Sequence, residues 1–283
     1  MSLEAIDKPL VTRTDAPVVT FIIPVRHQDN AKDCPALGGR LMQTVQSIAS
    51  QTHASWRGLI VANVGAQIPA LPQGFEVVRV TFPPNQLHDL GAGDKEAMYD
   101  AFRWDKGRRV LSGMIAAGPT GYFMIVDDDD FVSRDITAHA ANNYGANGWT
   151  IENGYIWSEG GRLAFLHSHF ASFCGTSHVI RSDLYEVPSS VAAASEDYVK
   201  TMLGSHVRIE AILAAKGSPL QSLPFPGAIY RVGHAGAHSK SRGMIRNFVV
   251  NKSTLRSPQL FLTNVSKLRF ISKGMADAFG MSV

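Results

Sequence analysis

The chain has 283 residues, of which 45% are hydrophobic and 18% are charged, and its formal net charge is +3. This composition excludes an intrinsically disordered chain, which needs low hydrophobicity and high net charge. Two cysteines, Cys34 and Cys174, are too few for a disulfide-stapled miniprotein and fit a reducing compartment. Because the chain has no run of 18 apolar residues and no apolar signal core in residues 1–17, we expect a cytoplasmic protein without a membrane span.

The small net charge hides an asymmetry between the body and the C-terminal end. Residues 1–230 hold 18 Lys/Arg and 23 Asp/Glu, whereas residues 231–283 hold 9 Lys/Arg and one acid, Asp277. A basic end on an acidic body indicates that an anionic group is held near that end. A solvated basic helix or tail is the alternative interpretation.

The first half of the sequence alternates apolar strand patterns with helical patterns. Strands are predicted at residues 18–23, 59–62, 75–80 and 122–126, and helices at residues 41–50 and 95–117. Such alternation is typical of βαβ units, so we predict an α/β fold with a mainly parallel central sheet flanked by helices. Sheets of this kind bind ligands at the carboxyl ends of their strands.

The second half is less regular. Helical patterns cover residues 191–203 and 207–216, residues 217–241 are rich in glycine and proline and predict a loop, and a polar helix or two ends the chain. No linker is evident, which favours one domain. Its predicted parts are an N-terminal arm (1–17), a nucleotide-binding half (18–135), an acceptor-side half (136–230) and a basic lid with a C-terminal helical segment (231–283).

Four consecutive carboxylates, Asp127 to Asp130, directly follow an apolar strand. Crowding them near a buried strand end is costly, and a divalent cation removes that cost. Strand alternation places Asp127 and Asp129 on one side and Asp128 and Asp130 on the other. An Asp-x-Asp pair there can hold Mg²⁺ or Mn²⁺ and a bridging diphosphate, so Asp127 and Asp129 are predicted metal ligands and Asp127 and Asp128 are predicted to bind the cofactor. The alternative is an acidic turn in which Asp130 or Ser133 caps a helix.

The ordered set of motifs resembles the glycosyltransferases of the GT-A fold, family 2 in particular. The similar segments are the opening strand and Pro-Val turn at 19–25, the helix end Ser47-Ile48-Ala49-Ser50-Gln51-Thr52, Lys106 with Gly113, and Val126 followed by the acidic run. The resemblance covers residues 18–135 and weakens beyond them. It implies a GT-A-type nucleotide-diphospho-sugar transferase fold and a nucleotide-sugar donor, UDP-linked in our reading, with Mn²⁺ or Mg²⁺ as the cofactor.

By position in that resemblance, Pro24, Val25 and Arg26 lie along the nucleoside. Asn63 stands where the family has an aspartate that reads the base, which is a departure, although an amide can still pair with a uracil edge. Lys106 and the two arginines after it form a basic group that could reach the diphosphate, with a solvated helix face as the alternative. A Gly-Thr turn, here Gly175-Thr176, lies under the donor sugar in the family.

An inverting transfer needs a general base for the acceptor hydroxyl. The family uses an acid of a Glu-Asp pair at a helix start, which resembles Glu196-Asp197. Counting back from Lys216-Gly217, the matching position instead falls on Ser205-His206, and a neutral histidine can do the same work near pH 7. Asp197 and His206 are therefore alternative bases, and a site without a base would be retaining or inactive.

A late Gly/Ala-rich segment carries two histidines, His234 and His238. Enzymes of the resembled fold often take a late histidine as an extra metal ligand, so both are predicted metal ligands, His234 first. Lys240 and Arg242 follow and fit a lid that closes on diphosphate and excludes water.

Together these features predict a metal-dependent glycosyltransferase that moves a sugar to a hydroxyl of an unknown glycan, lipid-linked or small-molecule acceptor. The alternative is a weak or inactive UDP-binding regulatory protein on the same fold. No nucleic-acid-binding module is recognisable. The basic residues from Arg256 to Lys273 are predicted either to be a solvated surface without a binding role or to contact the inner face of a membrane peripherally.

Overall fold

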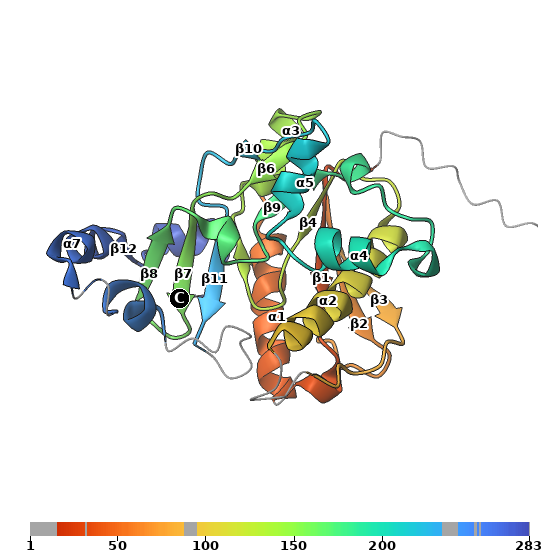
Figure 1. Cartoon of the computed structure of the whole chain (residues 1–283), viewed down its shortest axis with the longest axis horizontal. Coiled ribbons are helices and arrows are strands. Elements are labelled where there is room, and N and C mark those ends of the chain that lie inside the picture. The colour runs from red at the N-terminus through yellow and green to blue at the C-terminus, as the bar shows by residue number, and fades with distance from the viewer. Residues whose placement is uncertain are drawn as a thin grey trace, which may run out of the picture.

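The computed structural model describes residues 16–31, 33–87, 95–233, 243–251, 254 and 256–282, which fold into two sheets with helices around them (Figure 1). Within these residues, a seven-stranded sheet has the order β10-β6-β9-β4-β1-β2-β3. Its strands are β1 (Val19–Pro24), β2 (Trp56–Asn63), β3 (Phe75–Val80), β4 (Tyr122–Ile125), β6 (Gly148–Thr150), β9 (His178–Arg181) and β10 (Gln221–Ser222). Strands β4, β1, β2 and β3 run parallel, and β9 is antiparallel to both of its neighbours. The predicted α/β fold with a mainly parallel, helix-flanked sheet is confirmed.

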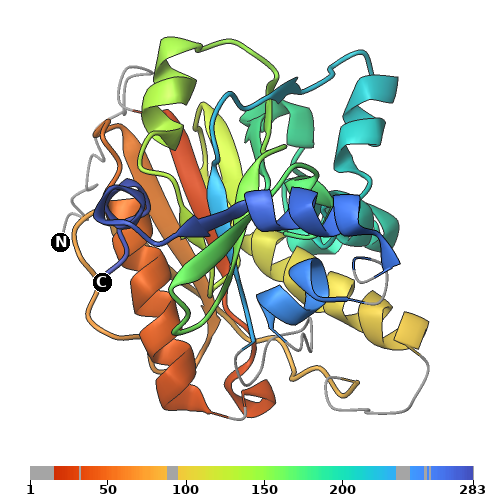
Figure 2. The same ribbon diagram turned by 90° about the vertical axis from the view of Figure 1, so that its left-hand side faces the viewer.

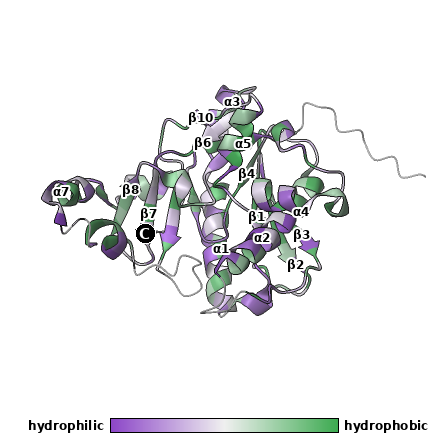
Figure 3. Ribbon diagram, viewed as in Figure 1, coloured by the Kyte–Doolittle hydropathy of each residue, from purple (hydrophilic) through white to green (hydrophobic). Residues whose placement is uncertain are grey.

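The centre of this sheet is buried on both faces. Along β1, Phe21 and Ile23 belong to the core on one face, and Ile22 belongs to the core on the other. The same alternation occurs along β4, where Met124 and Phe123 point to opposite faces. A strand buried on both sides reads as a continuous apolar run, which is why these two strands were predictable. Figure 3 shows the hydrophobic colour along the strands and both colours on the flanking helices.

Two long helices cover the two faces. Helix α1 (Cys34–Ala49) begins at Asp33, whose side chain accepts a hydrogen bond from the Ala36 amide, and packs on the first core. Helix α2 (Lys95–Ala117) packs on the second core. A Cβ added at Gly113 would lie 2.8 Å from the Val61 side chain, so this glycine lets α2 approach the sheet closely.

A five-stranded sheet, in the order β12-β8-β7-β11-β5, lies beside the first (Figure 1), and Figure 2 shows it after a 90° turn about the vertical axis. Its strands are β5 (Phe131–Val132), β7 (Gly154–Ser158), β8 (Leu163–His167), β11 (Ala228–Val232) and β12 (Leu268–Phe270). The predicted loop at 217–241 is therefore wrong over the residues that form β10 and β11. Their alternation was too short, between prolines and glycines, to separate strand from loop.

The predicted helix over residues 191–203 is broken into η4 (Val191–Ala193), α4 (Glu196–Tyr198) and the π-helical turn η5 (Val199–Leu203). Close packing on α2 accompanies the break, because a Cβ at Gly107 would lie 2.2 Å from the Val199 carbonyl and one at Gly204 would lie 1.9 Å from the Arg103 carbonyl.

The other helical elements are shorter. They are η1 (Gln28–Asn30), α3 (Ile136–Asn142), η2 (Phe170–Ser172), η3 (Ser182–Tyr185), α5 (Ile209–Ala215), η6 (Ile245–Val249), α7 (Pro258–Ser266) and α8 (Lys273–Ala278). None of the helices in the described part of the chain is long and apolar enough to cross a membrane.

Candidate functional site

The acidic run lies at the carboxyl edge of the parallel sheet and forms a turn after β4. The Asp130 amide donates to the Asp127 carbonyl at 3.2 Å, which closes the turn. Asp128 and Asp130 are buried, whereas Asp127 and Asp129 are partly exposed. The four residues therefore form a turn rather than a strand, and Asp127 and Asp129 are its two partly exposed carboxylates.

Asp130 fixes this turn from the inside. Its Oδ2 accepts hydrogen bonds from the Thr176 hydroxyl at 2.7 Å and from the Cys174 thiol at 3.2 Å, and its Oδ1 accepts from the Arg231 amide at 3.2 Å. Burial and the neighbouring carboxylates raise the pKa of Asp130 well above its usual range. The idea that Asp130 or Ser133 caps a helix is wrong, since α3 begins after Asp135 without a side-chain cap.

Two cations face the acidic run. Lys106 Nζ donates to Asp127 Oδ1 at 2.5 Å, and Arg26 Nη2 lies 3.6 Å from Asp128 Oδ1. Burial is the largest effect on Lys106 and opposes its charge, but the combined effects of Asp127, Cys174 and Asp130 outweigh it, so the pKa of Lys106 is raised. Burial also raises the pKa of Asp128 to about 6, against the opposing effect of Arg26. The predicted neighbours Arg26, Lys106, Asp127 and Asp128 therefore do meet at one place.

The donor set suits a hard cation only in part. Carboxylate oxygens are the ligands that Mg²⁺ and Mn²⁺ prefer, and the buried Asp128 Oδ2 has no hydrogen-bond partner in the described part of the chain. Yet no three His, Cys, Asp or Glu side chains among the described residues are grouped so that they could hold a metal. The predicted ligands His234 and His238, and the predicted lid residues Lys240 and Arg242, lie outside the described residues.

Gly175 lies against the Lys106–Asp127 ion pair. A Cβ at this position would be 2.6 Å from Asp127 Oδ2 and 2.6 Å from Lys106 Nζ. The neighbouring Thr176 hydroxyl accepts a hydrogen bond from the Asp127 amide at 2.9 Å while it donates to Asp130. The Gly-Thr turn thus packs directly under the acidic run.

Gly175→Ala is expected to displace this ion pair with little loss of fold stability, because both contacted atoms are the ends of mobile side chains. If this edge of the sheet binds UDP, as the sequence predicts, its affinity should fall about tenfold, as for the loss of one charge-assisted contact. The free energy of unfolding should change by less than about 1 kcal/mol. Isothermal titration and urea unfolding would measure the two quantities. Gly39→Ala is the matched control, since a Cβ there meets nothing within 4 Å. Unchanged affinity in Gly175→Ala would contradict the prediction.

A pocket opens beside the ion pair. Its walls include Lys106, Gly175, His178, Ser205 and His206, and apolar side chains complete it. Lys106 comes from α2, Gly175 from the turn before β9, His178 from β9 itself, and Ser205 and His206 from the segment between η5 and α5. The pocket therefore joins the acidic edge of the first half of the chain to one of the two predicted bases.

Both imidazoles of the pocket are neutral near pH 7. Burial and Lys106 lower the pKa of His206, against the opposing effects of Asp127 and of a hydrogen bond to the Ser172 main chain. Burial, with His206 as its neighbour, lowers the pKa of His178 to about 3. The Nε2 atom of each ring has no hydrogen-bond partner in the described part of the chain. In a neutral imidazole one ring nitrogen carries the lone pair that a general base needs.

The other predicted base lies elsewhere. Asp197 is exposed in the first turn of α4 and is not part of the pocket wall. Its neighbour Glu196 pairs with Lys200, which also pairs with Asp100 of α2. The Glu-Asp pair thus starts a helix on the surface. Of the two predicted bases, His206 is the one that lines the pocket.

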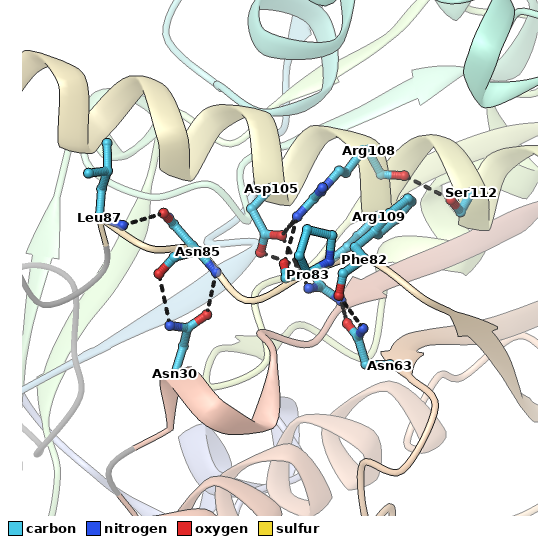
Figure 4. Close-up of polar contacts among 10 residues, drawn as sticks. All are labelled: Asn30, Asn63, Phe82, Pro83, Asn85, Leu87, Asp105, Arg108, Arg109 and Ser112. Atoms are coloured by element: carbon cyan, nitrogen blue, oxygen red, sulfur yellow. Dashed lines mark hydrogen bonds and ion pairs between the residues drawn. The ribbon is translucent and has the colours of Figure 1, made fainter.

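The edge formed by β1, β2 and β3 holds the residues predicted to line the nucleoside. Pro24 and Val25 are buried, and the Val25 amide donates to the Val61 carbonyl at 2.9 Å. Asn63, only 3% exposed, donates to the Phe82 carbonyl at 2.6 Å and accepts from Arg109 Nη1 at 2.5 Å. Its amide is therefore held by the protein itself (Figure 4).

Arg109 and Arg108 share one carboxylate, Asp105. Asp105 Oδ2 accepts from Arg109 Nε at 3.0 Å, and Asp105 Oδ1 accepts from Arg108 Nη2 at 2.6 Å. The Arg108 guanidinium also lies 4.4 Å from the centre of the Phe82 ring. Neither arginine is on a solvated helix face, since Arg108 is 9% and Arg109 is 1% exposed. Of the basic group predicted to reach a diphosphate, only Lys106 faces the acidic run.

The roles of Asp105, Thr176 and His178 in the site were not predicted from the sequence. The spacing of Asp105 and Arg109 is that of an i, i+4 pair, so this contact was readable from the helix. Nothing local in the sequence marks Thr176 as the anchor of the acidic turn or His178 as the neighbour of His206, because each contact joins segments far apart in the chain.

Comparison with protein-family models finds none that matches the chain. Comparison with curated proteins likewise finds no match. Among solved structures, the chain is similar to S. aureus TarS residues 1–349, with 12% identity, a TM-score of 0.40, and coverage of 75% of this chain and 60% of that one. A second structure of S. aureus TarS has 11% identity and a TM-score of 0.41, and the match covers 76% of this chain and 36% of that one.

A third similar structure is Rv0371C from Mycobacterium tuberculosis H37Rv in complex with manganese, with 10% identity, a TM-score of 0.34, and coverage of 76% of this chain and 91% of that one. The chain spans 60% and 36% of the length of the two TarS chains that it matches. Likenesses at these TM-scores leave the function to be inferred from the chain's own residues.

Proposed function

We propose that the chain is a glycosyltransferase that moves a sugar from a UDP-sugar to a hydroxyl group of an acceptor. The observation that carries this proposal is the Lys106–Asp127 pair at the carboxyl edge of a parallel sheet, beside a pocket that contains His206. An ion pair that suits a metal-bound diphosphate and a neutral histidine that can act as a base therefore lie next to each other. An inverting, metal-dependent transferase with a nucleoside diphosphate leaving group needs both.

On the donor side, Asp127 and Asp129 would hold Mn²⁺ or Mg²⁺ with a ligand from His234 or His238. When bound, the ion would neutralise charge on the leaving diphosphate. Lys106 would contact a diphosphate oxygen, and Arg26 would lie along the nucleoside while it neutralises Asp128. Lys240 and Arg242 would close over the leaving group and exclude water.

We expect Asn63 to contribute only modestly to recognition of the nucleobase. Its amide oxygen and nitrogen each already have a protein partner, so a uracil edge would share these groups rather than find them open. Pro24 and Val25 would supply the apolar wall beside it. We expect selectivity among nucleobases to be weaker than in a site with an unshared aspartate.

On the acceptor side, His206 would be the general base of an inverting transfer. His206 is in the wall of the pocket that adjoins the ion pair, and its buried Nε2 has no hydrogen-bond partner among the described residues, whereas Asp197 is exposed on α4. The glycan, lipid-linked or small-molecule acceptor would present its hydroxyl to this pocket.

The test of the donor side is isothermal titration of UDP with and without Mn²⁺. We expect Mn²⁺ to tighten UDP binding at least tenfold, because charge neutralisation of the diphosphate requires the ion. Asp129→Ala should remove that gain and leave weak, metal-independent binding. The control is Asp183→Ala, which removes an exposed carboxylate paired with Arg181 on the surface.

If the unaltered chain does not bind UDP, or binds it equally well without metal, the proposed UDP-sugar donor is wrong. Turnover separates the transferase from a UDP-binding protein without catalysis. A transferred product, or metal-dependent hydrolysis of the UDP-sugar by water as acceptor, supports the transferase, and tight UDP binding with neither outcome supports the binding protein.

A further inference from the structure

A second surface lies at the end of the molecule that carries the C-terminal elements. Figure 1 places α7 and β12 at one extremity, away from α2 and β3, and Figure 2 turns that end toward the viewer. Helix α7 (Pro258–Ser266) contains no charged residue and no buried residue. A helix with neither property is unusual on a protein surface exposed only to water.

The exposed side chains here are strongly apolar. Leu262 is 66% exposed and Phe270 is 76% exposed, and Leu260 and Val265 are each about 40% exposed. Six of the eleven large hydrophobic side chains that are exposed in the described part of the chain lie between residues 245 and 270. Their concentration in so short a segment exceeds the scattered exposure expected of a monomer surface and marks an interaction site.

The helix is nevertheless anchored rather than detached. Phe261 packs against the core that Ile156 and Phe165 form under the second sheet, and Asn264 Nδ2 donates to the Phe248 carbonyl at 2.8 Å. Ser257 accepts from the Leu260 amide at 3.4 Å and so caps the helix start. The remaining apolar side chains of α7 are thus presented outward by a fixed support.

The same C-terminal segment carries several cations. Arg246, Arg256, Lys267, Arg269 and Lys273 lie between residues 243 and 282, against the single acid Asp277. In the part of the chain that the structure describes, none of the five pairs with a carboxylate. Arg269 donates instead to the carbonyls of Ser266 and Leu268 at the end of α7. The segment is therefore rich in exposed apolar side chains and has a net positive charge.

We propose that this surface, formed by η6, α7 and β12 and here called the C-terminal face, binds the surface of an anionic lipid bilayer. Leu262, Val265 and Phe270 would enter the boundary between headgroups and acyl chains, and the cations would contact anionic headgroups. The charge decides against a second copy of the chain as the occupant, because two such faces repel each other. Arg269 on the edge strand β12 also disfavours strand pairing between copies, because two such edges would bring like charges together. This inference does not depend on the proposed transferase activity.

The experiment is co-sedimentation of the full chain with vesicles of phosphatidylcholine containing phosphatidylserine, compared with vesicles of phosphatidylcholine alone. We expect binding to the anionic vesicles only, and we expect added NaCl to weaken it, since screening shortens the reach of the cations. Arg269→Glu with Lys273→Glu should weaken binding at least fivefold for each reversed cation. Leu262→Ser with Phe270→Ser should weaken it about tenfold without restoring binding to neutral vesicles.

Matched controls lie elsewhere on the surface. Val64→Ser with Val207→Ser removes two apolar side chains of similar exposure, and Arg208→Glu reverses an exposed cation outside the C-terminal face. Both controls should bind anionic vesicles as the unaltered chain does. All altered residues are exposed, so circular dichroism and thermal unfolding should be unchanged in every variant.

Failure of the unaltered chain to bind anionic vesicles at low salt would overturn the proposal. Equal loss in the controls would do so as well, because it would mean that net charge alone drives the association. Sedimentation velocity tests the alternative that the C-terminal face binds a second copy of the chain. A dimer that Leu262→Ser with Phe270→Ser dissociates, without vesicle binding, would assign the C-terminal face to a second copy.

Discussion

Substitution of His206 by glutamine is expected to lower turnover of the UDP-sugar by about 10²–10⁴-fold, which is the usual contribution of general base catalysis. Burial and Lys106 lower the pKa of this imidazole, so its Nε2 can accept a proton near pH 7. Glutamine keeps much of the side-chain size but cannot take a proton. Metal-dependent hydrolysis of the donor is a usable assay while the acceptor is unknown, because water then supplies the hydroxyl.

The effect should fall on turnover and not on binding. We expect His206→Gln to bind UDP and Mn²⁺ as the unaltered chain does, since the carboxylates of the acidic run are untouched. His169→Gln is the matched control, because His169 is exposed and outside the pocket. Its turnover should be unchanged.

Asp197→Asn distinguishes the two alternative bases. Because Asp197 is exposed on α4, we expect its replacement to change turnover less than about threefold. Loss of turnover in Asp197→Asn, with normal turnover in His206→Gln, would instead assign the base to Asp197 and require α4 to move toward the pocket when donor binds.

The parallel half of the fold was predictable because its signals are local. The β1 and β4 segments are continuous apolar runs since both faces of these strands are buried, and α2 was predicted with the bounds that the structure has. The segment 191–203 has an equally good helical pattern, yet it is broken. Its conformation is decided by close contact with α2 at Gly107 and Gly204, which a pattern within the segment cannot reveal.

The site divides in the same way. The acidic run was recognisable from its position after a strand, but the strand alternation predicted for it does not apply, because residues 127–130 form a turn. The choice between Asp197 and His206 needed the three-dimensional arrangement, since it depends on which of two segments reaches Lys106. The contribution of His178 could be recognised only from the structure, in which β9 and the segment after η5 line the same pocket.

The largest effect on stability is expected for Asp105→Ala. This carboxylate, 13% exposed, accepts hydrogen bonds from both Arg108 and Arg109, and the Arg109 side chain is only 1% exposed. Its removal leaves a buried guanidinium whose remaining partner is the neutral amide of Asn63. Breaking a buried ion pair by removal of one partner costs about 3–5 kcal/mol, so the midpoint of urea unfolding should fall accordingly.

Asp100→Ala is the matched control on the same helix. Asp100 is 46% exposed, and its partner Lys200 keeps a second carboxylate, Glu196. An exposed pair of this kind contributes less than about 1 kcal/mol. The contrast between the two variants therefore separates the loss of a buried counter-ion from the loss of a helix-surface carboxylate.

Asp105→Asn refines the interpretation. The amide keeps one oxygen acceptor but loses the negative charge, so a stability between those of the unaltered chain and Asp105→Ala would apportion the loss between hydrogen bonding and charge. Because Arg109 holds Asn63, both Asp105 variants should also weaken UDP binding if Asn63 lies at the nucleobase. A loss below about 1 kcal/mol in Asp105→Ala would show that Arg109 reaches water on the loss of its carboxylate. The edge formed by β1, β2 and β3 would then be loosely packed, and a rigid nucleoside site there would be untenable.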